Sequence, residues 1–200
     1  YNDQAAIEAA GMGPTQADLA AINALRTHED VARLIGRPDI ALDFPLGIYI
    51  DLDERNPDRF LVQMTHGGLS LPDREYYLSQ DTAFAEIRQQ FQAHVGRMLT
   101  AGGISGAEAK ARQIFALETE IARHHWPIEQ RRERERIYNL LNRAQIRALE
   151  PRFPWDAWLE SAELGGVQEI NVHELSAMQP LARTVLNTPV ATWKAYFTYK

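Results

Sequence analysis

The stretch "GGLSLPDREYYL", Gly67–Leu78, is the segment of this sequence that most restricts the fold. Its paired glycines permit a tight turn, and its two leucines alternate, so that both can face one core. Its proline fixes φ ahead of a short helical turn. Its two tyrosines offer large packing areas and hydroxyls that need hydrogen-bond partners. The residues of this block that we single out are Gly68, Leu69, Leu71, Pro72, Arg74, Tyr76 and Tyr77.

The sequence just before this block predicts a β-hairpin. The runs "LGIYIDL" and "RFLVQM" are typical of strands, and "DERNPD" between them is a turn-forming cluster. We therefore expect one short hairpin at about residues 46–64.

Most of the remaining chain has helical periodicity. Residues 27–30 have the T-x-x-D pattern of a capping box at a helix start, and residues 105–108 have the spacing of a second box. Apolar residues recur at helical spacing over about residues 82–101 and 107–125. The predicted fold class is mainly α, a multi-helix domain with the one short hairpin.

Composition excludes several classes of protein. The chain is 45% apolar and 24% charged, which is the ordinary globular range. Its net charge of -6 argues against nucleic acid as the main partner, because phosphate binding needs a basic face. The run "RRERER", residues 131–136, carries both signs and is interpreted as a solvated helical face. With no cysteine, these residues form neither disulfides nor a thiolate metal site.

Two short stretches are near matches to H-E-x-x-H, the zinc motif of metallopeptidases. In "HELSA", residues 173–177, and in "HEDVA", residues 28–32, alanine stands where the second histidine is required. A catalytic zinc needs three protein ligands, so neither stretch is a zinc site by itself. Both are better interpreted as helix starts with a glutamate in the first turn. We expect one of these helices to start near Asn171, with Glu174 in its first turn.

A third arrangement of metal-ligating residues has no recognised motif. Glu120 and His124 lie four residues apart on a predicted helix and could share a face. Together with His173 they would make a self-contained metal hydrolase, which we keep as an alternative. The residues alone therefore give no complete catalytic, cofactor-binding or metal-binding site.

The Gly67–Leu78 block resembles the G-L-x-L-P-x-R-x-Y-Y block of the neprilysin and endothelin-converting-enzyme family of zinc metallopeptidases. Neighbouring features follow in a similar order, because a hairpin precedes the block and "IFALETEIARHHW" and "FPWDAWL" resemble later family segments. The further positions that match family patterns are interpreted as structural, and they are Glu118, Arg132, Tyr138 and Asn139.

The resemblance implies that residues 1–200 are a single piece of the family's N-terminal helical domain, which caps the catalytic zinc domain. The family's H-E-x-x-H lies downstream of the match, so the resemblance implies no catalytic, cofactor-binding or metal-binding residue here. Zinc is implied for the parent enzyme and not for this chain. The implied function is to limit access of peptide substrates to the active-site chamber of a zinc-dependent metalloendopeptidase.

Three further expectations concern the parent protein and its partners. The chain lacks an initial Met and ends in the aromatic run "ATWKAYFTYK" without a cap, so we expect a piece of a longer protein. If Trp193, Tyr196 and Phe197 were exposed in that piece, it would self-associate to bury them. The family includes exported and anchored members, which favours an exported parent (periplasmic, secreted or membrane-anchored) and leaves a cytoplasmic one as the alternative. The alternative function is a helical binding or scaffold module with no peptidase activity.

Overall fold

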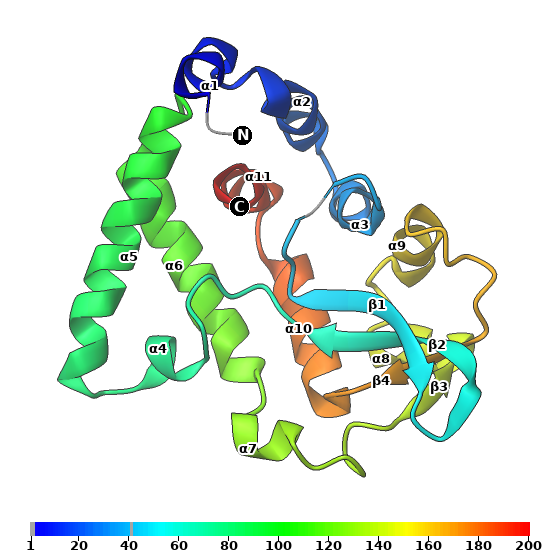
Figure 1. The fold of residues 1–200 in the computed structure, drawn as a ribbon. Coiled ribbons are helices and arrows are strands. Elements are labelled where there is room, and N and C mark those ends of the chain that lie inside the picture. The colour runs from blue at the N-terminus through cyan, green and yellow to red at the C-terminus, as the bar shows by residue number, and fades with distance from the viewer. Residues whose placement is uncertain (1–2, 41) are drawn as a thin grey trace.

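Helices dominate the computed structural model, which describes residues 3–40 and 42–200 (Figure 1). The mainly α fold class is therefore confirmed. None of the described helices is both long enough and apolar enough to span a bilayer. The helices are α1 (Gln4–Ala10), the 3-10 helix η1 (Gly13–Thr15), α2 (Gln16–Ala24), α3 (His28–Gly36), α4 (Glu75–Leu78), α5 (Thr82–Ala101), α6 (Ala107–His124), α7 (Ile128–Arg131), α8 (Arg143–Leu149), α9 (Trp155–Ser161), α10 (Leu175–Asn187) and α11 (Val190–Tyr199).

Side-chain caps explain where several helices begin. At α3 the Thr27 hydroxyl accepts the Asp30 N–H at 3.1 Å, and the Asp30 carboxylate accepts the Thr27 N–H at 2.8 Å, which confirms the predicted box. The box predicted at residues 105–108 is wrong. Helix α6 begins after Gly106, which has φ +67° and leaves the helix start without a side-chain cap. The left-handed turn at this glycine starts the helix one residue later than the box requires.

The predicted hairpin is confirmed, and it forms half of a four-stranded sheet. Strands β1 (Leu46–Asp53) and β2 (Asn56–His66) pair antiparallel. Two further short strands, β3 (Leu140–Asn142) and β4 (Glu169–Val172), complete the sheet in the order β1-β2-β4-β3. Strand β4 runs parallel to β2, with Val62 opposite Ile170.

The position of β4 corrects the expectation of a helix start near Asn171. Residues 169–172 form ladder hydrogen bonds with both neighbouring strands, and α10 starts only at Leu175. Glu174 is the N-cap residue of α10 rather than a residue of its first turn. The run at residues 131–136 is exposed as expected, but only its first residue belongs to a helix, the four-residue α7.

The core lies between the sheet and the long helical pair α5 and α6 (Figure 1). Helices α10 and α11 fill the middle of the molecule, where both pack against α6. On the far side of α11, α2 and α3 close the core. The sheet and α6 are therefore joined through α10, and the loop that crosses between them carries the Gly67–Leu78 block.

The C-terminal aromatic residues are buried, which corrects the expectation that they are exposed. Trp193, Tyr196 and Phe197 are at most 2% exposed. The Trp193 indole N–H donates to the Val185 carbonyl at 3.1 Å, and its ring lies 5.1 Å from that of Phe44. The rest of the described chain already covers these rings, so they give no reason for self-association.

Candidate functional site

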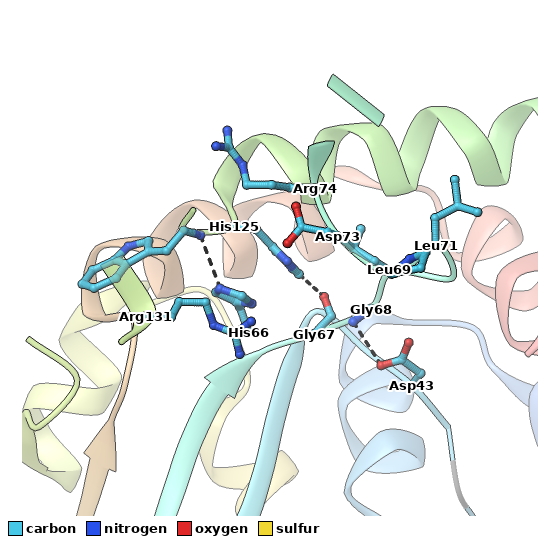
Figure 2. A pocket seen from close by; sticks show the side chains of 12 residues that line it. Asp43, His66, Gly67, Gly68, Leu69, Leu71, Asp73, Arg74, His125 and Arg131 are labelled. Atoms are coloured by element: carbon cyan, nitrogen blue, oxygen red, sulfur yellow. Dashed lines mark hydrogen bonds between the residues drawn. The ribbon is translucent and has the colours of Figure 1, made fainter. Parts of the chain in front are cut away.

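A cavity of about 190 Å³ lies where the Gly67–Leu78 block meets the end of α6 (Figure 2). This volume is below the roughly 300–1,000 Å³ of typical small-molecule sites. Five of the seven singled-out block residues line it, together with polar groups from four other segments. The lining is Asp43, His66, Gly67, Gly68, Leu69, Leu71, Pro72, Asp73, Arg74, His125, Trp126 and Arg131.

Two histidines from distant parts of the sequence stack in the wall of this cavity. His66 ends β2 and His125 follows the last turn of α6, and their ring centroids are 3.8 Å apart. His125 Nε2 donates to the Gly67 carbonyl at 2.8 Å, because a carbonyl can only accept. His66 Nε2 accepts the backbone N–H of Trp126 at 3.3 Å, so this nitrogen carries no proton.

Burial keeps both imidazoles neutral. Loss of solvation, together with the charge of the Arg131 guanidinium, lowers the pKa of His66 from 6.5 to about 3. Loss of solvation likewise lowers the pKa of His125 to about 3, with His66 as the next cause. An imidazole with a pKa near 3 is neutral at pH 7 and too weak a base to accept a proton there, so neither histidine is suited to general acid–base catalysis.

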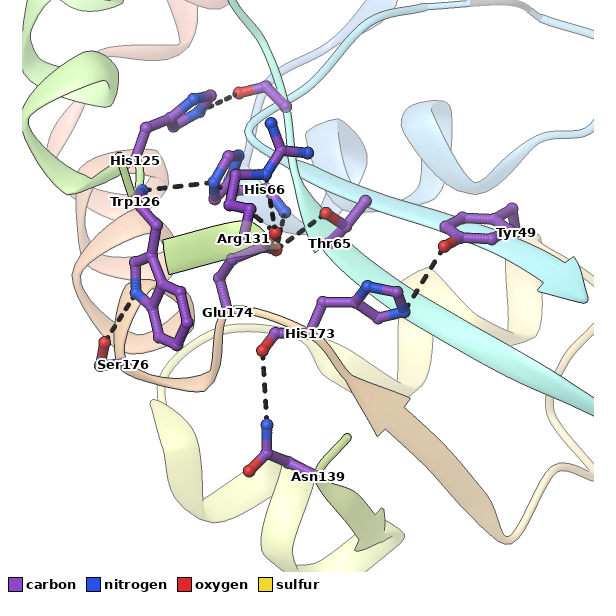
Figure 3. Close-up of polar contacts among 11 residues, drawn as sticks. Tyr49, Thr65, His66, His125, Trp126, Arg131, Asn139, His173, Glu174 and Ser176 are labelled. Carbon is purple, nitrogen blue, oxygen red and sulfur yellow. Dashed lines mark hydrogen bonds and ion pairs between the residues drawn. The ribbon is translucent and has the colours of Figure 1, made fainter. Parts of the chain in front are cut away.

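The glutamate of "HELSA" connects three segments beneath this histidine pair (Figure 3). Glu174 is 1% exposed and accepts hydrogen bonds from the Thr65 hydroxyl at 2.8 Å and the His66 N–H at 3.2 Å. Arg131 donates to the same carboxylate from Nε at 3.1 Å. Sequence reasoning missed this role, because its partners lie 43 residues or more away in the chain.

The Gly67–Leu78 block is tied to α6 by a second buried carboxylate. Glu118 is fully buried and accepts hydrogen bonds from the Ser70 N–H at 3.1 Å, the Ser70 hydroxyl at 2.6 Å and the Tyr77 hydroxyl. Burial raises the pKa of Glu118, while Lys200, with its Nζ 3.6 Å away, and the Ser70 and Tyr77 hydroxyls oppose that shift. Burial also raises the pKa of Tyr77, and the Glu118 charge adds to that shift.

Other block residues fix the backbone of the crossing loop. Gly68 has φ +88°, and a Cβ there would lie 2.8 Å from the Pro45 nitrogen, so only glycine fits. Arg74 donates from Nε to the Ala122 carbonyl at 3.3 Å at the end of α6. The ring of Tyr76 packs edge-on against that of Phe84, with centroids 4.9 Å apart.

The three remaining family-pattern residues lie in the segment after α7. Tyr138 donates its hydroxyl to Asp53 at 2.9 Å, which fastens this segment to the hairpin. Asn139 donates from its amide to the Val172 carbonyl at 2.8 Å and connects the segment to β4. Arg132 is exposed, and its side chain has no hydrogen bond or ion pair within the described residues. The structure therefore gives anchoring positions to two of the three.

The candidate metal residues do not come together. Among the described residues, no group of three or more His, Asp or Glu side chains could hold a metal ion. The alternative site of Glu120, His124 and His173 is therefore wrong. Glu120 accepts from His124 on the surface of α6 at 3.2 Å, whereas His173 donates to Gln63 on the sheet at 3.0 Å. His28 of "HEDVA" donates to the Thr188 carbonyl at 2.8 Å.

Comparison with known proteins extends over the whole chain. The sequence model of the N-terminal part of peptidase family M13 matches residues 1–200. Endothelin-converting enzyme 1 of Cavia porcellus is 26% identical over 147 residues, which are 70% of this chain and 19% of that protein. Endothelin-converting enzyme-like 1 of Homo sapiens is 25% identical over 158 residues, 76% of this chain and 20% of that protein.

Solved structures give the same match. The zinc metalloprotease ZMP1 of Mycobacterium tuberculosis, in complex with an inhibitor, superposes with a TM-score of 0.90 at 28% identity. The match covers 98% of this chain and 31% of that one. PEPO from Lactobacillus rhamnosis, at 15% identity and a TM-score of 0.68, shares the fold. The chain thus spans about a fifth of the curated relatives and about a third of the solved structures that it matches.

Proposed function

This chain belongs to peptidase family M13, and we propose that it is the non-catalytic helical cap of a zinc-dependent metalloendopeptidase that cleaves short peptides. The observation that carries the proposal is the superposition on ZMP1, a zinc metalloprotease, over 98% of this chain and 31% of that one. The matched part is the N-terminal domain of the family. The larger remainder of such a protein would carry the chemistry.

The arrangement of possible metal ligands among the described residues supports the assignment of the chemistry to another part of the protein. Zinc hydrolases bind their metal with three protein ligands, and no group of three suitable side chains occurs among residues 3–40 and 42–200. These residues therefore do not fit a zinc site, and we assign no step of peptide hydrolysis to them. Zinc would be bound by the catalytic domain of the parent enzyme.

The buried hydrogen bonds between the elements of this domain support a role as a rigid cap. The crossing loop is fixed to α6 through Glu118. Glu174, at the start of α10, binds the end of β2 and Arg131 of α7, so the sheet is held to the helices on that side as well. A rigid domain placed over an active site admits small substrates and excludes folded proteins. It also keeps bulk water from the site during the reaction.

The proposal specifies partners and location. The partners are short peptide substrates, reached through the parent enzyme, and the catalytic domain of the same polypeptide. Nucleic acid is not among them, in keeping with the net charge of -6. We propose that the parent enzyme is exported, as a periplasmic, secreted or membrane-anchored protein.

The experiment that tests this function uses the full-length product of the gene. We expect about one zinc per polypeptide, together with cleavage of a short peptide that a chelator abolishes and added zinc restores. The same cleavable sequence, inserted into an exposed loop of a folded protein, is expected to react at least tenfold more slowly, because the cap excludes it.

Two results would contradict the proposal in different ways. A full-length protein without zinc or peptidase activity would favour the alternative, a helical binding module. An active zinc enzyme that cleaves the loop as fast as the peptide would retain the peptidase and remove the access-limiting role of this domain. As a control, the same cleavable sequence is placed in a disordered tail of the same folded protein. The comparison distinguishes exclusion by size from slow cleavage caused by the reduced flexibility of a loop.

A further inference from the structure

The far end of the β1–β2 hairpin extends beyond the rest of the sheet. Strand β4 pairs only with residues 62–64 of β2, so residues 50–60 of the hairpin have no neighbouring strand but their own. Figure 1 shows this end of the hairpin projecting from the sheet. Side chains in this part of the hairpin therefore depend on other segments, or on another surface, for burial.

One face of this end is apolar and open to solvent. Ile50, Leu52 and Phe60 are 60%, 47% and 73% exposed. Ile50 and Leu52 alternate along β1 and so point to the same side, and Leu52 lies directly opposite Phe60 in the register. Single exposed apolar residues are ordinary, but three adjacent ones form a patch of the kind that marks an interaction site. We call these three residues the hairpin patch.

The hairpin patch continues into a hollow at the base of the hairpin. This hollow has a volume of about 340 Å³ and lies between β1 and the α3–α9 pair. Its walls include Leu46, Ile48 and Trp158. Ile48 is on the same side of β1 as Ile50, so an apolar track runs from the hollow to the tip.

The opposite face of the hairpin is fixed in place, so the hairpin patch is presented rigidly. Asp53 is 1% exposed and accepts hydrogen bonds from Arg59 at 2.7 Å and Tyr138 at 2.9 Å. The Arg55 guanidinium lies 4.1 Å from the centre of the Tyr138 ring. A surface that is already ordered loses little entropy when it binds.

The charges around the hairpin patch indicate whether it binds a second copy of this chain or a different surface. Asp51, Glu54 and Asp58 have no ion-pair partner among the described residues, whereas the two hairpin arginines are already paired with carboxylates. In a symmetric dimer formed through the hairpin, both copies would bring the same unpaired carboxylates to the contact, and the hairpin arginines, which are already paired, would not balance them. The occupant that fits is an apolar surface with basic groups at its edge.

We propose that the hairpin patch docks against the catalytic part of the same polypeptide, outside residues 1–200. This inference rests on the proposed function, in which most of the protein lies outside these residues, as it does for ZMP1, where the match covers 31% of the chain. The occupant presents apolar side chains to Ile50, Leu52 and Phe60, and lysine or arginine side chains to the acidic tip.

Thiol footprinting of the full-length protein tests this contact. The 200 residues contain no cysteine, so Phe60→Cys introduces a unique thiol within them, and wild-type protein corrects for any thiol elsewhere. Met98→Cys is the matched control, because Met98 is 49% exposed on α5, away from the hairpin. Each rate of maleimide labelling is divided by the rate for the same variant in urea.

We expect native labelling at residue 60 to be at least tenfold slower than in urea, while labelling at residue 98 stays within about threefold. Labelling at residue 60 as fast as in urea would overturn the proposal. So would protection that disappears on dilution together with a dimer seen by light scattering, since the occupant would then be a second copy. Zinc content and peptide cleavage are measured separately. Slow labelling at residue 60 in a protein without zinc would contradict the proposed peptidase function and would leave the contact of the hairpin patch supported.

Discussion

The imidazole rings of His66 and His125 stack with centroids 3.8 Å apart and an angle of 27° between their planes, although 58 residues separate the end of β2 from the end of α6. The two histidines connect the sheet to the long helices α5 and α6 at the edge of the cavity. Two stacked imidazoles tolerate each other only while both are neutral. This contact is therefore a pH-sensitive point between the sheet and the helices.

Acid is expected to weaken the fold through this pair. The pKa of each histidine is lowered from 6.5 to about 3, so the unfolded state binds more protons between these values and stability falls as pH falls. From pH 7 to pH 5 the loss is about 2 kcal/mol per histidine. In His125→Gln the amide can still donate to the Gly67 carbonyl, so the free energy of unfolding should lose about 2 kcal/mol less over this range. Urea denaturation at both pH values measures the difference.

The control for this prediction is His94→Gln, because His94 is exposed on α5. The control should lose as much stability between pH 7 and pH 5 as the wild type. An equal loss in wild type and His125→Gln would show that the buried pair is not the source of acid sensitivity.

Removal of the Glu174 carboxylate is expected to destabilise the chain by about 2–3 kcal/mol. Glu174→Ala leaves the His66 N–H and the Thr65 hydroxyl without their acceptor, in a place that water does not reach freely. Urea denaturation at pH 7 provides the value. Glu133→Ala, which removes an exposed partner of Arg136, should cost no more than about 0.5 kcal/mol. Equal effects of the two substitutions would count against a structural role for Glu174.

The close approach at Gly68 predicts a larger effect than backbone strain alone. Gly68→Ala places a Cβ 2.8 Å from the Pro45 nitrogen at φ +88°, and we expect a loss of at least about 2 kcal/mol. Gly103→Ala is the matched control, since Gly103 has φ +75° and a Cβ added there would have no atom within 4 Å. It should cost about 1 kcal/mol. Thermal unfolding of both variants gives the comparison, and similar losses would mean that the backbone around Pro45 yields.

The two adjacent tyrosines of the block are expected to differ sharply. Tyr77→Phe deprives Glu118 of a donor and the Leu71 N–H, at 2.9 Å, of its acceptor, and should cost about 1–3 kcal/mol. Tyr76→Phe removes a hydroxyl that makes no hydrogen bond to a described residue, and should change stability by less than about 0.5 kcal/mol. The free energies of unfolding of the two variants decide. A tolerated Tyr77→Phe would mean that water replaces the hydroxyl.

Local signals gave much of the fold. The Thr27–Asp30 box, the hairpin and the long helices could be predicted because their caps, turns and periodicity lie within a few residues. The pairing of β3 and β4 with the hairpin could not be predicted, because strands of three and four residues have no detectable period and their partners are distant in the sequence. The burial of Trp193 could not be predicted for the same reason, because Phe44, which packs against it, is distant in the sequence.

The candidate site was predicted in part. The Gly67–Leu78 block was recognised from its sequence, and five of its singled-out residues line the cavity. The histidine pair and the Glu174 contacts were missed, because no local pattern relates His66 to His125 or Glu174 to Arg131. A buried glutamate looks the same in sequence as one in a first helical turn, and only its distant partners distinguish the two.

The parallel pairing of β2 with β4 has a consequence for synthesis on the ribosome. Gln63 and Asn171 are neighbours in the sheet but 108 residues apart in the chain, so β2 leaves the ribosome long before its partner. At translation rates of about 5–20 residues per second, that interval is roughly 5–20 s. During this time the hairpin exposes an unpaired edge together with its apolar face, and both features promote aggregation of a nascent chain. A chaperone that holds residues 46–66 until β4 emerges would protect the protein at its most vulnerable stage.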